Sequence, residues 1–73
     1  MAGGVYKVIE LVGTSSESWE AATKAALAEA AATLDDIRIA EVVKMDARLE
    51  NNKIVEFRTR LTVSFKYHKE LSD

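Results

Sequence analysis

The chain has 73 residues, of which 48% are hydrophobic and 30% charged, with three glycines, no proline and no cysteine. A chain of this length is expected to form one domain over residues 1–73, with an ordered core over about residues 4–68. The lack of cysteine excludes disulfides and thiolate metal sites, and no apolar run approaches the roughly 18 residues of a membrane span. A net charge of −2 without a basic cluster argues against nucleic acid as a partner, and the cytoplasm is the expected location.

Size alone predicts an oligomer. A chain this short buries only about 60% of the surface that its unfolded form exposes, which leaves little net stability. Because neither a disulfide nor a metal motif is present, burial between copies of the same chain is the remaining source of stability.

The first half of the chain predicts a strand followed by a helix. Residues Val5–Val12 are rich in β-branched and apolar side chains, which indicates a strand covered on both faces. Gly13 interrupts this pattern, and the hydroxyl-bearing residues after it predict a helix that begins near Ser16. From Trp19 to Leu34 the chain is rich in alanine, and its apolar stripe consists of Trp19, Ala22, Ala26, Leu27, Ala30 and Leu34.

After Asp36 the hydrophobic period changes to two, which predicts two strands of about 13 residues on either side of Asn51-Asn52. A two-residue turn would oppose a polar face to an apolar one, so a three-residue loop over 51–53 is favoured. The resulting register pairs Ala47 with Phe57, Val43 with Leu61 and Ile39 with Phe65 on the apolar face, and Arg48 with Glu56 and Asp46 with Arg58 on the polar face.

The element order is therefore β-α-β-β. It predicts an α+β fold in which a three-stranded antiparallel sheet, with the first strand beside the third, wraps around one helix. Both edges of such a sheet stay open, which again favours closure by neighbouring subunits.

Catalytic chemistry has little support in the sequence. His68 is the only histidine, so neither a histidine-based nucleophile arrangement nor a histidine metal cluster can form within one chain, and no glycine-rich phosphate loop is present.

Glu41 falls on the apolar phase, opposite Val63 in the predicted register. It could form an ion pair within the subunit or with a neighbour, turn outward at a bulge, or contact a ligand or cation. Trp19 is expected to be a core or interface anchor rather than a ligand-stacking platform.

The stretch Leu11-Val-Gly-Thr-Ser15, the alanine-rich helix after Trp19, and the segments Ala40-Glu41-Val42 and Val63-Ser-Phe65 in the two long strands resemble the dodecin family over about residues 5–66. The resemblance implies a non-catalytic homododecamer that stores or sequesters a small ligand. Many dodecins bind flavins, stacking the rings between tryptophans.

The resemblance also implies a changed pocket, whose equivalent positions are Ile39, Glu41, Asp46 and Arg58. Ile39 stands at the family's stacking tryptophan, Arg58 at its flavin-binding glutamine, and Asp46 at or near an arginine that meets the flavin phosphate. The segment Asp36-Ile-Arg-Ile-Ala40 resembles a calcium-binding branch of the family. The expected partner is thus a small molecule or cation. The alternatives are binding of calcium, binding of riboflavin or flavin mononucleotide, and a structural oligomer without a ligand. No residue is assigned as a metal ligand.

Overall fold

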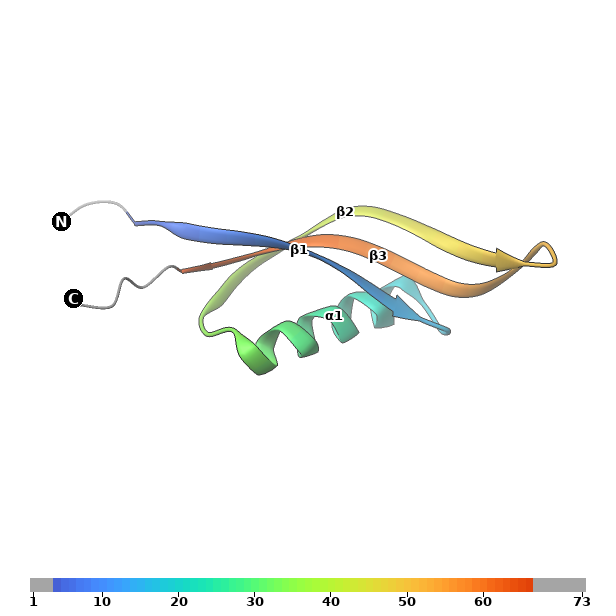
Figure 1. Ribbon diagram of the computed structural model, residues 1–73, viewed down its shortest axis with the longest axis horizontal. Helices are drawn as coiled ribbons and strands as arrows, with labels where there is room; N and C mark the ends of the chain where they lie inside the picture. Colours follow the sequence, from blue (N-terminus) through green and yellow to red (C-terminus); the bar gives the residue numbers. More distant parts are fainter. Residues whose placement is uncertain (1–3, 67–73) are drawn as a thin grey trace.

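The computed structural model describes residues 4–66, so His68 lies outside the described residues. Strand β1 spans Tyr6–Ser15, helix α1 spans Trp19–Thr33, strand β2 spans Ile37–Glu50 and strand β3 spans Lys53–Lys66 (Figure 1). The predicted β-α-β-β order is confirmed. No helix within residues 4–66 is long and apolar enough to cross a membrane.

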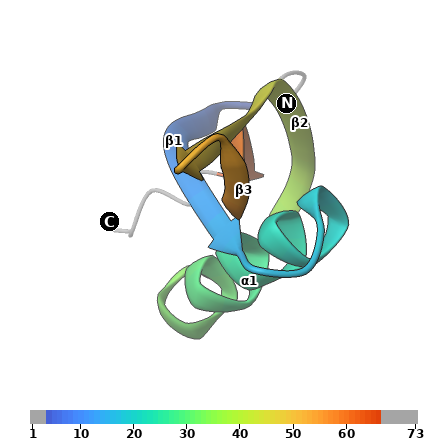
Figure 2. The same ribbon diagram turned by 90° about the vertical axis from the view of Figure 1, so that its right-hand side faces the viewer.

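The three strands form one antiparallel sheet in the order β1-β3-β2, as the sequence predicts. Helix α1 lies on one side of this twisted sheet, mainly against β1 and β3 (Figure 2). The β2–β3 hairpin extends beyond the helix, and the subunit measures 56 × 20 × 14 Å (Figure 1). The turn end of the hairpin is thus left without cover from the helix of its own subunit (Figure 1).

The boundary between β1 and α1 differs from the prediction. The strand does not stop at Gly13 but continues to Ser15, and the helix begins at Trp19 with Ser18, rather than Ser16, as its N-cap. Gly13 is paired with Thr59 inside the sheet. It interrupts the hydrophobic pattern because a Cβ at this position would collide with the carbonyl oxygen of Ala22 on the helix.

Small side chains bring α1 close to the sheet. The Ser18 hydroxyl accepts a hydrogen bond from the N–H of Ala21 at 2.9 Å, which satisfies one free donor of the first turn. The buried face of the helix consists of Ala22, Ala26 and Ala30. Opposite them the fully buried side chains are Thr59, Leu61 and Val63 of the central strand. The core of a single subunit is therefore thin.

The hairpin turn corrects the predicted loop. Asn51 and Asn52 form a two-residue turn with φ angles of 51° and 64°, and Glu50 pairs with Lys53. A register shift between Arg48 and Leu49 restores the match of polar faces beyond the turn. The predicted pairs Asp46–Arg58, Ala47–Phe57 and Arg48–Glu56 are confirmed. The prediction placed one extra residue in the loop, and the structure places one extra residue in the bulge instead, so the register beyond the bulge is the same.

Two further register shifts change the pairing along the rest of β2. They lie between Ile37 and Ile39 and between Val42 and Lys44. In place of the predicted partners, Val42 pairs with Leu61, Ile37 pairs with Phe65, and Glu41 pairs with Thr62 instead of Val63. A single register applied to the whole strand does not contain these bulges, and each one exchanges the two faces of the strand beyond it.

Large hydrophobic side chains remain exposed on both outer strands. The exposed members on β2 are Ile39, Val42, Val43, Met45 and Leu49, and those on β1 are Tyr6, Val8 and Val12. The prediction that the first strand is covered on both faces is therefore wrong for a single subunit, since α1 covers only one face. These side chains leave apolar surface exposed on both outer strands of the subunit.

Candidate functional site

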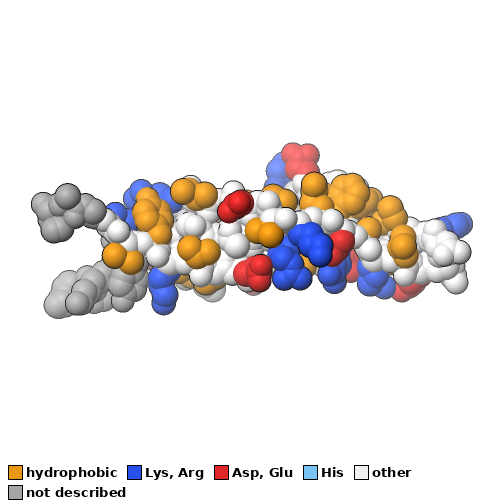
Figure 3. All heavy atoms as spheres, turned by 90° about the horizontal axis from the view of Figure 1, so that it is seen from above, with side chains coloured by type: hydrophobic (Ala, Val, Ile, Leu, Met, Phe, Trp, Pro, Cys, Tyr) orange, Lys and Arg blue, Asp and Glu red, His pale blue; other side chains and the backbone are white. Residues whose placement is uncertain are grey.

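The four pocket-equivalent residues lie on one face of the sheet. Thr59, Leu61 and Val63 of β3 point toward α1, so the alternate residues of β3 and the β2 residues paired with them point away from the helix. This outer face carries Ile39, Glu41, Asp46 and Arg58, paired as Ile39–Ser64, Glu41–Thr62 and Asp46–Arg58. Basic and acidic side chains gather near its middle, with hydrophobic side chains on either side (Figure 3).

The charged residues of the outer face form rows across the three strands. One row contains Asp46, Arg58 and Thr14, the next contains Lys44, Arg60 and Val12, and the third contains Glu41, Thr62 and Glu10. A row with one ion pair is thus followed by a row with two cations and by a row with two carboxylates. The sign of the charge changes along the face over a few residues.

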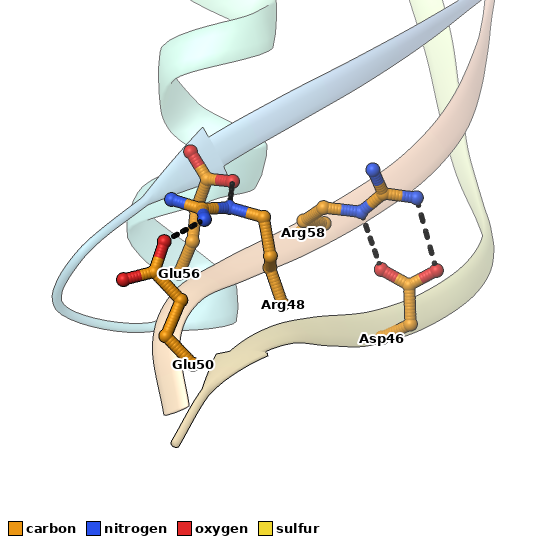
Figure 4. Close-up of polar contacts among 5 residues, drawn as sticks. All are labelled: Asp46, Arg48, Glu50, Glu56 and Arg58. Atoms are coloured by element: carbon orange, nitrogen blue, oxygen red, sulfur yellow. Dashed lines mark hydrogen bonds and ion pairs between the residues drawn. The ribbon is translucent and has the colours of Figure 1, made fainter. Parts of the chain in front are cut away.

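Asp46 and Arg58 form a two-pronged ion pair. Arg58 Nε donates to Asp46 Oδ1 at 2.8 Å and Arg58 Nη2 donates to Oδ2 at 3.3 Å (Figure 4). The hydrogen bonds from Arg58 are the main cause that lowers the pKa of Asp46, and the nearby charges of Lys44 and Arg60 lower it further. The pKa of Arg58 is raised in turn, chiefly by its hydrogen bonds to Asp46.

A second ion-pair group lies toward the hairpin turn. Arg48 Nη1 donates to Glu50 Oε2 at 2.7 Å and Arg48 Nε donates to Glu56 Oε1 at 3.0 Å, so one guanidinium bridges two carboxylates (Figure 4). These hydrogen bonds, to Glu50 first and then to Glu56, raise the pKa of Arg48. With one positive and two negative charges, this group keeps a net charge of −1.

Trp19 connects the helix to the site. Its indole N–H donates to the main-chain oxygen of Asp46 at 2.9 Å, and its ring meets Phe57 edge-on with centroids 4.8 Å apart. The Trp19 carbonyl oxygen accepts from the hydroxyls of Thr59 at 3.1 Å and Thr23 at 2.9 Å. The sequence predicts an anchor at Trp19, but its bond to Asp46 joins residues 27 positions apart and has no signal in the sequence.

Ile39 and Glu41 share the outer face but not the ion-pair group. Ile39 is 57% exposed on the row beyond Glu41, and Glu41 is exposed and forms no ion pair within residues 4–66. The bulge at Val43 turns Glu41 outward, which is one of the alternatives that the sequence leaves open. Over the described residues, a single subunit encloses no pocket and gathers no group of three His, Cys, Asp or Glu side chains.

Comparison with known proteins identifies the family. The dodecin family model matches residues 5–68, which is most of the chain. The chain belongs to the dodecin family. Members of this family are non-catalytic binding proteins that form homododecamers and take up small molecules or ions.

Two relatives and one solved structure define the similarity further. A calcium dodecin from Mycobacterium tuberculosis is 44% identical over 62 residues, covering 85% of this chain and 87% of that protein. A dodecin from Thermus thermophilus is 42% identical over 64 residues, covering 88% of this chain and 93% of that protein. The crystal structure of a calcium-chelating calcium dodecin from M. tuberculosis superposes with a TM-score of 0.80 at 40% identity, covering 94% of this chain and 96% of that chain.

Proposed function

We propose that this protein is a homododecameric binding protein whose outer face holds a small ligand or ion, in a dodecin-type pocket that has lost its flavin chemistry. The ion pair between Asp46 and Arg58 carries the proposal. Both carboxylate oxygens and two guanidinium nitrogens are engaged with each other, so a flavin ring or phosphate would have to compete with this ion pair. A cytoplasmic location, expected from the lack of cysteine, stays a prediction.

The residues present fit a flavin poorly at three positions. Ile39 offers an aliphatic side chain where stacking on an isoalloxazine ring would need an aromatic one, a loss of about 0.5–1.5 kcal/mol per contact beyond area burial. The Asp46 carboxylate would repel a phosphate group. Arg58 keeps its charge and its bond to Asp46 instead of offering a neutral amide.

The assembly would complete the binding site. The exposed hydrophobic side chains of the outer face, among them Ile39 of β2 and Val12 of β1, would be covered by neighbouring copies in the dodecamer. A shallow face on one subunit can become a closed pocket when the same face of another copy is laid against it. The ligand is therefore expected at contacts between subunits.

Flavin titration tests the loss of flavin chemistry. Riboflavin and flavin mononucleotide are titrated with the intact oligomer while flavin fluorescence is followed, and the expected result is no strong quenching up to about 10 μM protein. The variant Ile39→Trp serves as the matched gain-of-stacking control and should quench more than the wild type. Strong quenching by the wild-type protein with micromolar or tighter affinity would contradict the proposal.

Calcium is the second candidate because of two observations. The M. tuberculosis relative carries calcium in its name, and on the outer face Glu10 and Glu41 flank Thr62 in the same row. Two carboxylates and a hydroxyl are oxygen donors of the kind that calcium prefers, and copies from adjacent subunits would add further ligands. Glu10 also lies 3.5 Å from Arg60, which a bound cation would have to displace.

A calcium-dependent thermal melt tests this candidate. Added calcium should raise the midpoint in a concentration-dependent way that a chelator reverses, since only the folded state holds the site. Glu41→Gln should abolish the shift, whereas Glu29→Gln, an exposed change on α1, should retain it. An unchanged wild-type midpoint at millimolar calcium would remove the calcium candidate.

A further inference from the structure

The Asp46 carboxylate is surrounded by cationic side chains on the outer face. Arg58 lies directly opposite, Lys44 precedes Asp46 by two residues on β2, and Arg60 follows Arg58 by two residues on β3. All three cations act on the carboxylate in the direction that keeps it ionised. The position of the Asp46 side chain is therefore one of positive potential, created by residues of two strands.

The cations need a counter-charge. Lys44 and Arg60 are directly opposite each other in the ladder, and like charges in that arrangement destabilise a sheet. Within residues 4–66, Lys44 forms no ion pair and Arg60 has a single contact, to Glu10 at 3.5 Å. Asp46 thus provides a negative charge that is bonded to Arg58 and lies beside the Lys44–Arg60 row.

The main chain at Asp46 is held independently of its carboxylate. The Trp19 indole N–H bonds to the Asp46 main-chain oxygen, and the flanking ladder pairs Met45 with Thr59 and Ala47 with Phe57. A side-chain change at residue 46 therefore removes the carboxylate while the main chain of β2 stays held.

We propose that Asp46 is a built-in anion, whose carboxylate occupies an oxyanion-binding site formed by Lys44, Arg58 and Arg60. The guanidinium of Arg58 presents two N–H groups to two carboxylate oxygens, and the same fork fits two oxygens of a phosphate. While Asp46 is present, ligands that carry a phosphate group are excluded from this face. The inference rests on the proposed function, which places a ligand on the outer face. It adds that Asp46 determines which charge that ligand can carry.

The variant Asp46→Asn tests the proposal with inorganic phosphate as the probe. The intact oligomer is melted at increasing phosphate against sodium chloride of equal ionic strength, with unfolding followed by circular dichroism. The wild-type midpoint should rise no more in phosphate than in chloride. The Asp46→Asn midpoint should rise by roughly 4 °C or more at ten times the dissociation constant, because phosphate binds only the folded state.

Matched variants separate the site from a general effect of lost negative charge. Glu20→Gln also converts a carboxylate to an amide and breaks an ion pair, the one with Lys24, but it lies on α1 and should gain no phosphate effect. Adding Arg58→Gln or Lys44→Gln to Asp46→Asn should abolish the gain. Should Asp46→Asn fail to assemble, Asp46→Ala provides the same test with a smaller side chain.

Several outcomes would overturn the proposal. These are an equal phosphate effect in the wild type, an equal effect in Glu20→Gln, or no effect in either variant at residue 46. None of these measurements requires that the wild-type protein bind flavin or calcium. A failed flavin or calcium test would therefore remove the proposed function and leave the phosphate result interpretable on its own.

Discussion

At the scale of single residues, the Asp46–Arg58 ion pair couples the charge state of one carboxyl to the folded state. Its hydrogen bonds to Arg58 lower the pKa of Asp46 in the folded protein below the value in the unfolded chain, which is about 3.9. A carboxyl whose pKa is lower in the folded protein than in the unfolded chain stabilises the fold. This stabilisation is fully present at pH values above the unfolded-chain pKa. It is lost as the pH falls from the unfolded-chain pKa to the folded-state pKa. The outer face is thus expected to be acid-sensitive.

The first prediction compares the wild type with Asp46→Asn across this range. The difference between their melting midpoints should be constant from about pH 7 to pH 5 and should shrink below about pH 4, where the wild-type carboxyl also becomes neutral. Circular dichroism melts at constant ionic strength measure it. Ala28→Asn, an exposed change on α1 that neither adds nor removes a titratable group, should differ from the wild type by the same amount at every pH.

A second prediction concerns Thr59, which is fully buried and donates its hydroxyl to the Trp19 carbonyl oxygen. Thr59→Val keeps the shape and removes the hydrogen bond, which should lower the free energy of unfolding by about 1 kcal/mol. Thr62→Val makes the same change on the outer face, where the hydroxyl forms no hydrogen bond within residues 4–66, and should cost less. Urea unfolding at one fixed subunit concentration measures both. A larger loss for Thr62→Val would contradict the assigned role of Thr59.

At the scale of elements, Gly13 sets how close α1 lies to the sheet. The strand continues through this residue, and its missing side chain makes room for the Ala22 carbonyl oxygen and the Ala26 methyl group. The helix presents only alanines at this contact, so neither element has a flexible side chain that could move away. The contact between β1 and α1 is therefore sensitive to a single added methyl group.

The third prediction follows from this contact. Gly13→Ala should destabilise the fold by roughly 1–3 kcal/mol, because the new Cβ meets helix backbone that has to shift. Gly4→Ala is the matched control, since its Cβ would meet only the flexible end of the Lys66 side chain. Urea unfolding of both variants gives the comparison. Equal stability of the two variants would show that the helix can move away freely.

The elements also show what the sequence could predict and what it could not. Periodicity gave the β-α-β-β order, and opposite charges gave the pairing of Asp46 with Arg58, because both signals are local to two adjacent strands. A bulge was one of the alternatives left open for Glu41, but its position at Val43 was not fixed, since an inserted residue leaves each half of the strand with a normal alternation. The contact of Trp19 with Asp46 also had no signal, because it depends on where the helix packs. The position of Ile39, Glu41, Asp46 and Arg58 on one face became evident only with the bulges in place.

At the scale of the whole molecule, one subunit is too extended to be a compact domain. Its radius of gyration is 15.4 Å, whereas a compact chain of this length would have about 11 Å. Both edge strands are open and β2 exposes a series of large hydrophobic side chains. These features agree with a protein whose fold is completed by its neighbours.

The fourth prediction tests that role for Met45, which is 58% exposed in the subunit. Met45→Glu should dissociate the oligomer, because a charge would be buried at a contact between copies. Ala28→Glu adds the same charge on the exposed side of α1 and should leave the assembly intact. Sedimentation velocity distinguishes the two. An unchanged sedimentation coefficient for Met45→Glu would place that side chain outside every subunit contact.

The hairpin that reaches beyond α1 has a practical consequence for anyone handling the protein. Since much of its hydrophobic surface finds cover only on other chains, unfolding and disassembly are expected to occur as a single event governed by mass action. Diluting a sample would then by itself lower the temperature at which it denatures, and two laboratories working at different concentrations would report different thermal tolerances for the same molecule.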